Sequence, residues 1–150
     1  MQRTLPLTFF IILVLGGGTL IGATVMPGPW YEALEKPWFN PPNWLFGPVW
    51  SVLYILIAIA GWRICRQGPT SPLMWIWWLQ LALNFAWSPV FFGAEQTGLA
   101  LIVILALLAA ILAFIALAWN RDRASALLFA PYAAWVAFAT VLNGSIWWLN

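Results

Sequence analysis

Residues 30–54 read WYEALEKPWFNPPNWLFGPVWSVLY and connect two long apolar stretches of the chain. Four prolines stiffen this segment, because each proline ring fixes its backbone φ. A connection that only had to be solvated would consist of glycine, serine and charged residues. A rigid backbone carrying indole rings instead favours a lid that folds back over a pocket in a membrane. The candidate lid residues are Trp30, Tyr31, Lys36, Pro37, Trp38, Pro41, Pro42 and Trp44.

The composition identifies an integral membrane protein. Of 150 residues, 64% are hydrophobic and 7% are charged, and the mean hydropathy is +0.90. Soluble domains carry about 25% charged residues. The length corresponds to a single domain, residues 1–150. The net charge of +2 is the balance of six basic and four acidic residues. The basic residues are scattered along the chain, which argues against a nucleic-acid partner.

Five stretches are apolar over the roughly 20 residues that a transmembrane helix needs. They cover residues 5–26, 44–64, 72–92, 97–119 and 124–149, and the first connection covers residues 27–43. The predicted fold is therefore an all-α membrane protein, a five-transmembrane-helix bundle with a tryptophan- and proline-rich first loop. No small-residue cleavage site follows the first stretch, so we expect a retained helix rather than a signal peptide.

The charged residues lie at the ends of these stretches and differ between the two sides of the membrane. Five arginines fall on one side, namely Arg3, Arg63, Arg66, Arg121 and Arg123, whereas Lys36 is the basic residue on the other. By the positive-inside rule, the N terminus is predicted to be cytoplasmic and the C terminus outside. A helical bundle of this kind suits a bacterial inner membrane.

Conventional metal and acid–base chemistry has little support in the sequence. Histidine is absent and Cys65 is the single cysteine, which removes the commonest metal ligand, the commonest general base and any intrachain disulfide. The apolar stretches contain no carboxylate. We therefore predict no metal site.

Polar side chains are few at membrane depth: Tyr54, Gln80, Asn84, Ser88, Tyr132, Thr140 and Asn143. Gln80, Asn84 and Ser88 recur every four residues and so share one helix face. Tyr132, Trp135, Ala139 and Asn143 form a similar stripe. Two such stripes suit a pocket for a flat, mostly apolar ligand. The alternative, open for Gln80 and Asn143, is interhelical hydrogen bonding worth about 0.6–2 kcal/mol per bond.

Most of the thirteen tryptophans fit an aromatic belt at the membrane interface. Those near predicted boundaries are Trp30, Trp38, Trp62, Trp75, Trp119, Trp147 and Trp148. Trp50, Trp87 and Trp135 lie deeper or on the polar stripes, so they are the preferred pocket residues. Gly18 and Gly22 form a small-residue face, for which packing within the chain is favoured over a dimer contact.

These motifs resemble the TspO/translocator protein family, the tryptophan-rich sensory proteins that include the peripheral benzodiazepine receptor. The first motif, W-Y-x-x-L-x-K-P-x-x-x-P-P-x-W, begins at Trp30 and is followed by Trp50 and Tyr54. LALNFAWSPVFFG occupies Leu81–Gly93, and PYAAWVAFATVLN occupies Pro131–Asn143. The resemblance covers essentially the whole chain.

The resemblance implies a five-helix bundle, commonly homodimeric, with a ligand pocket under the first loop. Implied ligands are porphyrins such as protoporphyrin IX, isoquinoline carboxamide and benzodiazepine drugs and, in animal members, sterol. Some relatives are assigned to outer membranes. The implied ligand-binding residues are Ala23, Phe46, Val49, Trp50, Tyr54, Asn84, Trp87, Trp135, Ala139, Leu142 and Asn143.

Animal members carry a tyrosine and an arginine near the end of the fifth helix, proposed as a sterol-recognition motif. Here Gly144, Ser145 and Trp148 occupy that region, so we do not expect sterol recognition there. The same pattern occurs in the first loop as Val25, Tyr31 and Lys36, which shows how weakly it discriminates.

We expect a membrane receptor, sensor or carrier that binds porphyrins and related planar hydrophobic ligands. No cofactor is required, because the porphyrin, protoporphyrin IX or haem, is the ligand. Oxidative porphyrin breakdown driven by light or oxygen, through Trp50 and Trp135, is the enzymatic alternative. A small exporter is a third hypothesis, and it would need an ionisable residue within a span.

Overall fold

The computed structural model describes residues 5–150, and this part of the chain is helical with no strand. The elements are α1 (Leu7–Ile11), η1 (Ile12–Gly16), α2 (Gly17–Thr24), α3 (Pro29–Ala33), η2 (Asn43–Leu45), α4 (Phe46–Gln67), α5 (Pro72–Ser88), η3 (Pro89–Gly93), α6 (Thr97–Ala118) and α7 (Arg123–Leu149). Of the charges used to predict the topology, Arg3 lies outside the described residues. The helical segments follow the predicted order and lie close to the predicted boundaries.

Four helical segments of the described chain are long and apolar enough to cross a membrane. They are Leu7–Thr24, Asn43–Gln67, Thr97–Ala118 and Arg123–Leu149. The predicted span 72–92 is also helical, as α5 followed by η3, but it is not among these four. Its regular α-helix has 17 residues, and the amides of Gln80 and Asn84 lower its hydropathy. The structure thus confirms a multi-helix membrane protein with four candidate spans.

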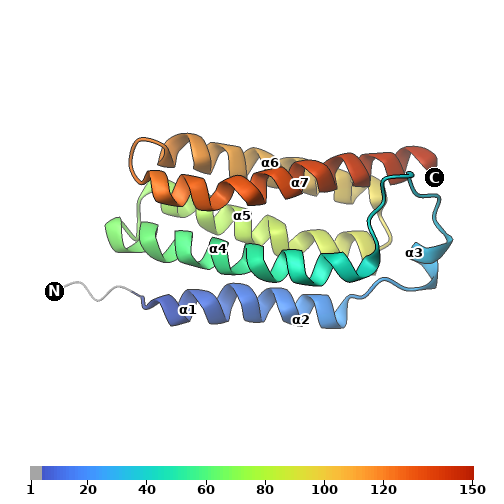
Figure 1. Cartoon of the computed structure of the whole chain (residues 1–150), viewed down its shortest axis with the longest axis horizontal. Coiled ribbons are helices and arrows are strands. Elements are labelled where there is room, and N and C mark those ends of the chain that lie inside the picture. Colours follow the sequence, from blue (N-terminus) through green and yellow to red (C-terminus); the bar gives the residue numbers. More distant parts are fainter. Residues whose placement is uncertain (1–4) are drawn as a thin grey trace.

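The long helices lie side by side, with the start of α1 at one end of the bundle and the C terminus at the other (Figure 1). Around the bundle, α1 contacts α4, α4 contacts α7, α7 contacts α6, α6 contacts α5, and α5 contacts α2. The helices therefore close into a ring. The short helix α3 and the rest of the first loop lie at the C-terminal end (Figure 1).

Gly18 of α2 leaves room for the ring of Tyr54 on α4. A Cβ atom at Gly18 would overlap this ring, whereas at Gly22 it would meet nothing within 4 Å. Gly18 therefore serves packing within the chain, as the sequence favoured. Gly61 accommodates Trp77 in the same way, and the Trp77 indole donates a hydrogen bond of 3.0 Å to the carbonyl of Ile57.

Candidate functional site

The first loop is fixed to the bundle by aromatic contacts with η3. Trp30 packs on Phe91 with ring centroids 5.9 Å apart, and Tyr31 packs on Phe92 at 5.3 Å. The ammonium group of Lys36 lies 4.6 Å from the Tyr31 ring centroid. Pro89 opens the π-helical turn of η3, which presents Phe91 and Phe92 to the loop. The N-terminal half of the predicted lid therefore packs on η3, and Phe39 further along the loop packs on Phe138 of α7 with ring centroids 6.1 Å apart.

Tyr31 is the buried centre of this contact, with 5% of its surface exposed. Its hydroxyl donates a hydrogen bond of 3.4 Å to Oδ1 of Asn40. Burial raises the pKa of Tyr31 and outweighs the hydrogen bond to Asn40, which lowers it, so the phenol stays neutral. Tyr31 and Lys36 belong to the sterol-recognition pattern that also occurs in the first loop. In the structure these two side chains pack against each other within the lid.

The C-terminal end of α7 holds the loop from a second side. The backbone N–H of Glu35 donates to Oδ1 of Asn150 at 3.1 Å, and Nδ2 of Asn150 donates to the Glu35 carbonyl at 3.0 Å. The same Nδ2 donates to the carbonyl of Ile146 at 2.7 Å. This clasp joins residues 115 positions apart in the sequence. No pattern in the sequence pointed to it.

The remaining lid residues do not cover the bundle. Trp38 is 94% exposed and Trp44 is 72% exposed, so their indoles project from the surface. Pro37 and Pro41 are half-buried, and Pro42 is exposed. These residues stiffen the segment between the docked α3 and the start of α4.

One polar stripe of α5 is hydrogen-bonded to α7. Nδ2 of Asn84 donates to the hydroxyl of Tyr132 at 2.7 Å, and that hydroxyl donates to Oε1 of Gln80 at 2.8 Å. Gln80 and Tyr132 are fully buried. Gln80 and Asn84 share one face of α5, as the spacing predicts, and both form hydrogen bonds to Tyr132 of α7. Nε2 of Gln80 is buried and has no partner among the described residues.

A second set of hydrogen bonds joins three helices near the lid. Nε1 of Trp87 donates to Oδ1 of Asn143 at 2.9 Å, and Nδ2 of Asn143 donates to the Thr97 carbonyl at 3.0 Å. Both ends of the Asn143 amide are therefore engaged. The sequence left two interpretations open for Asn143, a pocket wall or interhelical hydrogen bonds. The structure shows the interhelical hydrogen bonds.

The indoles of Trp50 and Trp135 lie on neighbouring helices. Trp50 is half-buried and lies 6.4 Å from Tyr132 and 5.5 Å from Tyr54, measured between ring centroids. Trp135 is half-buried and lies 5.7 Å from Phe46. Nε1 of Trp135 is buried with no hydrogen-bond acceptor among the described residues. Two ring pairs, Phe46 with Trp135 and Trp50 with Tyr132, thus lie on α4 and α7, and together they are called the aromatic wall.

The other predicted ligand-binding residues are distributed around this wall. Val49 is half-buried on α4, whereas Ala139 and Leu142 are buried on α7. Ala23 is exposed on α2. The structure therefore brings the α4 and α7 residues together and leaves Ala23 at the surface.

Two cavities are defined by other residues. One of about 640 Å³ lies beneath the start of the lid, lined by Trp30, Leu34, Glu95, Gln96, Thr97, Gly98, Trp147, Trp148 and Asn150. The other, of about 280 Å³, is lined by Ile64, Gln67, Gly68, Ser71, Leu73 and Arg121. Of the predicted residues, Trp30 alone lines either cavity. Trp147 and Trp148 had been interpreted as interfacial belt residues.

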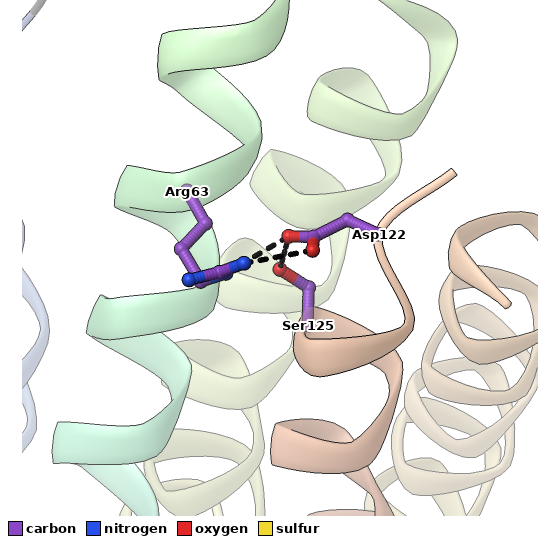
Figure 2. Close-up of polar contacts among 3 residues, drawn as sticks. All are labelled: Arg63, Asp122 and Ser125. Atoms are coloured by element: carbon purple, nitrogen blue, oxygen red, sulfur yellow. Dashed lines mark hydrogen bonds and ion pairs between the residues drawn. The ribbon is translucent and has the colours of Figure 1, made fainter. Parts of the chain in front are cut away.

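At the opposite end of the bundle from the lid, an ion pair joins α4 to the start of α7 (Figure 2). Nε and Nη2 of Arg63 each donate to a carboxylate oxygen of Asp122 at 2.9 Å. The Ser125 hydroxyl donates to the same carboxylate. The hydrogen bonds from Arg63 are the main cause that lowers the pKa of Asp122 to about 2, so this carboxylate is ionised.

Comparison with known proteins identifies the family. The family model described as TspO/MBR family matches residues 9–149. The chain belongs to the TspO/MBR family. The resemblance predicted from the tryptophan-rich motifs is confirmed, and this TspO/MBR protein is an apolar helical membrane protein.

Relatives of this TspO/MBR protein span bacteria and animals. Protein CrtK of Rhodobacter capsulatus is 38% identical over 154 residues, covering 100% of this chain and 95% of the relative. A tryptophan-rich sensory protein of Cereibacter sphaeroides is 35% identical over 150 residues, covering 100% and 94%. The translocator protein of Homo sapiens is 37% identical over 139 residues, covering 87% and 82%.

Proposed function

We propose that this protein is an integral membrane receptor, sensor or carrier that binds porphyrins, such as protoporphyrin IX, and related planar hydrophobic ligands. Membership of a family with members named translocator protein and tryptophan-rich sensory protein supports this role. One structural observation supports the proposed binding role most strongly. Trp50 and Trp135 are half-buried on adjacent helices, and the buried Trp135 Nε1 has no acceptor among the described residues.

This arrangement suits a flat ligand that carries a hydrogen-bond acceptor. Indole faces stack on planar aromatic systems, and a buried donor without an acceptor costs about 1–3 kcal/mol. A porphyrin that stacks on the wall and accepts from Trp135 would recover that cost. Isoquinoline carboxamides and benzodiazepines have the same combination of planar rings and carbonyl acceptors, so the proposal includes them as ligands.

A free-base porphyrin is the preferred ligand over haem. The sequence has no histidine. Cys65 and Met74 are buried in the core at 3% and 1% exposure, which leaves the 66% exposed Met26 and the tyrosines as candidate iron ligands. Haem iron therefore has few available axial ligands. Stacking and shape, rather than iron ligation, would hold the tetrapyrrole.

The membrane arrangement follows from the same proposal. The segment formed by α5 and η3 runs alongside the four candidate spans (Figure 1), and we infer that it is the fifth span. The four arginines at the end away from the lid favour a cytoplasmic N terminus and an external lid and C terminus. We further propose a homodimer in a bacterial inner membrane.

The test is a fluorescence titration of purified protein in detergent with protoporphyrin IX. Trp135→Ala is expected to weaken the porphyrin affinity at least about tenfold, since it removes a stacking face and a donor. Trp119→Ala is the matched control, because Trp119 is 43% exposed and packs against Arg123. Equal effects of the two substitutions would mean nonspecific partitioning and would refute a specific site.

Oxidative porphyrin breakdown is the second candidate. Trp50 contacts both Tyr54 and Tyr132, which gives a photoexcited porphyrin on the wall a chain of oxidisable rings. Protoporphyrin should then be consumed under light in the presence of oxygen, with much slower consumption by Trp50→Phe at unchanged affinity. If the wild-type protein consumes no porphyrin and Trp50→Phe only lowers the affinity for it, the receptor role is favoured.

A further inference from the structure

The end of the bundle away from the lid carries an excess of positive charge. Arg63, Arg66, Arg121 and Arg123 lie there with a single carboxylate, Asp122. The ion pair in Figure 2 neutralises Asp122 with Arg63. In the described part of the chain, the other three guanidinium groups form no ion pair, so this end has a local charge of about +3.

Two of these three arginines mark the membrane interface. The guanidinium of Arg66 lies 4.8 Å from the Trp62 ring centroid, and that of Arg123 lies 4.5 Å from the Trp119 centroid. Arginine stacked on tryptophan at a helix end is typical of the level of lipid headgroups. These contacts engage Arg66 and Arg123 outside the smaller cavity.

Arg121 is the charged residue that lines the 280 Å³ cavity. The cavity lies between the connection from α4 to α5 and the connection from α6 to α7. Its walls combine apolar Ile64 and Leu73 with the polar side chains of Gln67 and Ser71. The Ser71 oxygen accepts from the backbone N–H of Met74 at 3.2 Å, which leaves its hydroxyl proton free to donate.

We propose that this cavity binds the phosphate headgroup of an anionic phospholipid. The Arg121 guanidinium would pair with the phosphodiester oxygens, a geometry that arginine forms in a bidentate manner. The Ser71 hydroxyl supplies a further donor. The cavity volume of about 280 Å³ is well above what a single water needs, which leaves room for a group of several heavy atoms.

The position of the cavity favours a lipid over a free phosphate ion. Ile64 and Leu73 contribute apolar atoms to the cavity wall, which suits a phosphate attached to a glycerol carbon better than a free ion. The tryptophan–arginine pairs place the cavity at headgroup depth. A net negative headgroup such as phosphatidylglycerol also matches the positive charge of this end. The site is independent of the proposed porphyrin-binding wall.

Native mass spectrometry of the purified full chain tests the proposal, with phosphatidylglycerol and phosphatidylcholine of identical acyl chains. One phosphatidylglycerol per chain is expected to bind preferentially. Arg121→Gln should lower its affinity about tenfold, because hydrogen bonds to charged groups contribute more than neutral ones. Arg123→Gln removes the same charge at the same end but outside the cavity, and should change the affinity less than about twofold.

Arg121→Lys keeps the charge and loses the bidentate geometry, so an intermediate affinity is expected. Circular dichroism and gel-filtration elution confirm that each variant is folded. Equal losses for Arg121→Gln and Arg123→Gln would assign the effect to the general surface charge and overturn the site. Equal binding of both lipids would overturn it as well. Saturable binding of inorganic phosphate that displaces phosphatidylglycerol from the wild-type protein at similar concentrations would overturn the assignment to a lipid.

Discussion

A single phenol hydroxyl organises the polar interior. The Tyr132 hydroxyl accepts from Asn84 and donates to Gln80, so one oxygen satisfies groups from two positions of α5. All three residues are buried. Since lipid offers no replacement hydrogen bonds, such a group is retained at membrane depth only when its partners are present.

Tyr132→Phe should destabilise the protein by about 1–2 kcal/mol, because it leaves two buried amide groups without their partner. The measurement is the midpoint of unfolding in mixed micelles of dodecyl sulfate, followed by far-UV circular dichroism. Tyr54→Phe is the control. The hydroxyl of Tyr54 makes no hydrogen bond in the described structure, so we expect a change below about 0.5 kcal/mol. A Tyr132→Phe midpoint no lower than that of Tyr54→Phe would contradict this account.

For single residues, the sequence predicts which side chains share a helix face better than it predicts their hydrogen-bond partners. The four-residue spacing of Gln80 and Asn84 correctly placed both on one face, because helical geometry follows directly from spacing. The choice between a pocket wall and an interhelical bond depends on the rotation of α7, which spacing does not give. The structure shows that Tyr132 faces both amides.

Individual elements are tied together at both ends of the bundle. At one end the lid is held by η3 and by the Asn150 clasp. At the other end, Arg63 of α4 holds Asp122, which precedes α7, in an ion pair of 2.9 Å (Figure 2). This ion pair adds a charged contact to the packing of α4 against α7.

The ion pair predicts a pH dependence of stability. The pKa of Asp122 is lowered from 3.8 to about 2 in the folded protein, so the unfolded chain takes up a proton at higher pH than the folded chain. The stabilisation is therefore complete above about pH 4 and is lost as the pH falls towards 2. We expect Asp122→Asn to cost about 1 kcal/mol at neutral pH, because the pair is partly solvated.

Unfolding midpoints in mixed micelles at pH 7 and at low pH measure this effect. The difference between the wild-type protein and Asp122→Asn should shrink as the pH falls from 4 towards 2. Arg63→Gln removes the partner of the same carboxylate and should behave similarly. A wild-type advantage that stays constant down to pH 2 would show that the ion pair does not set the stability of this contact.

Element boundaries were predictable where apolar stretches end in charge or proline. The starts of α6 and α7 follow Glu95 and Asp122 closely. In contrast, α4 continues past Arg63 and Arg66 to Gln67, three residues beyond the expected end at residue 64. The π-helical turn of η3 was not predicted, since it depends on how Pro89 disrupts the hydrogen-bond ladder in a packed bundle. The short helix α3 was also missed, because the lid was interpreted from its prolines and indoles rather than from helix periodicity.

In the described chain the helices contact one another in a ring, and the first loop lies at one end of the bundle (Figure 1). Its class, helix order, lid and family were accessible from composition and motifs. The positions of the two cavities were not, because they form between connections distant in sequence, such as Leu34 with Trp147 and Gln67 with Arg121. The first loop packs on the bundle around Trp30 and Tyr31, while Trp38 and Trp44 project from the surface, and its role as a lid over a ligand pocket stays a prediction.

The central claim is that the aromatic wall of α4 and α7 binds one porphyrin per chain. Calorimetric titration of the purified protein in detergent with protoporphyrin IX in the dark tests it most directly. The account predicts a saturable isotherm with one site per chain and a loss of at least about tenfold in affinity for Trp50→Ala, which removes an indole face of the wall. A linear, non-saturating uptake that is identical in the wild-type protein and in Trp50→Ala would contradict it.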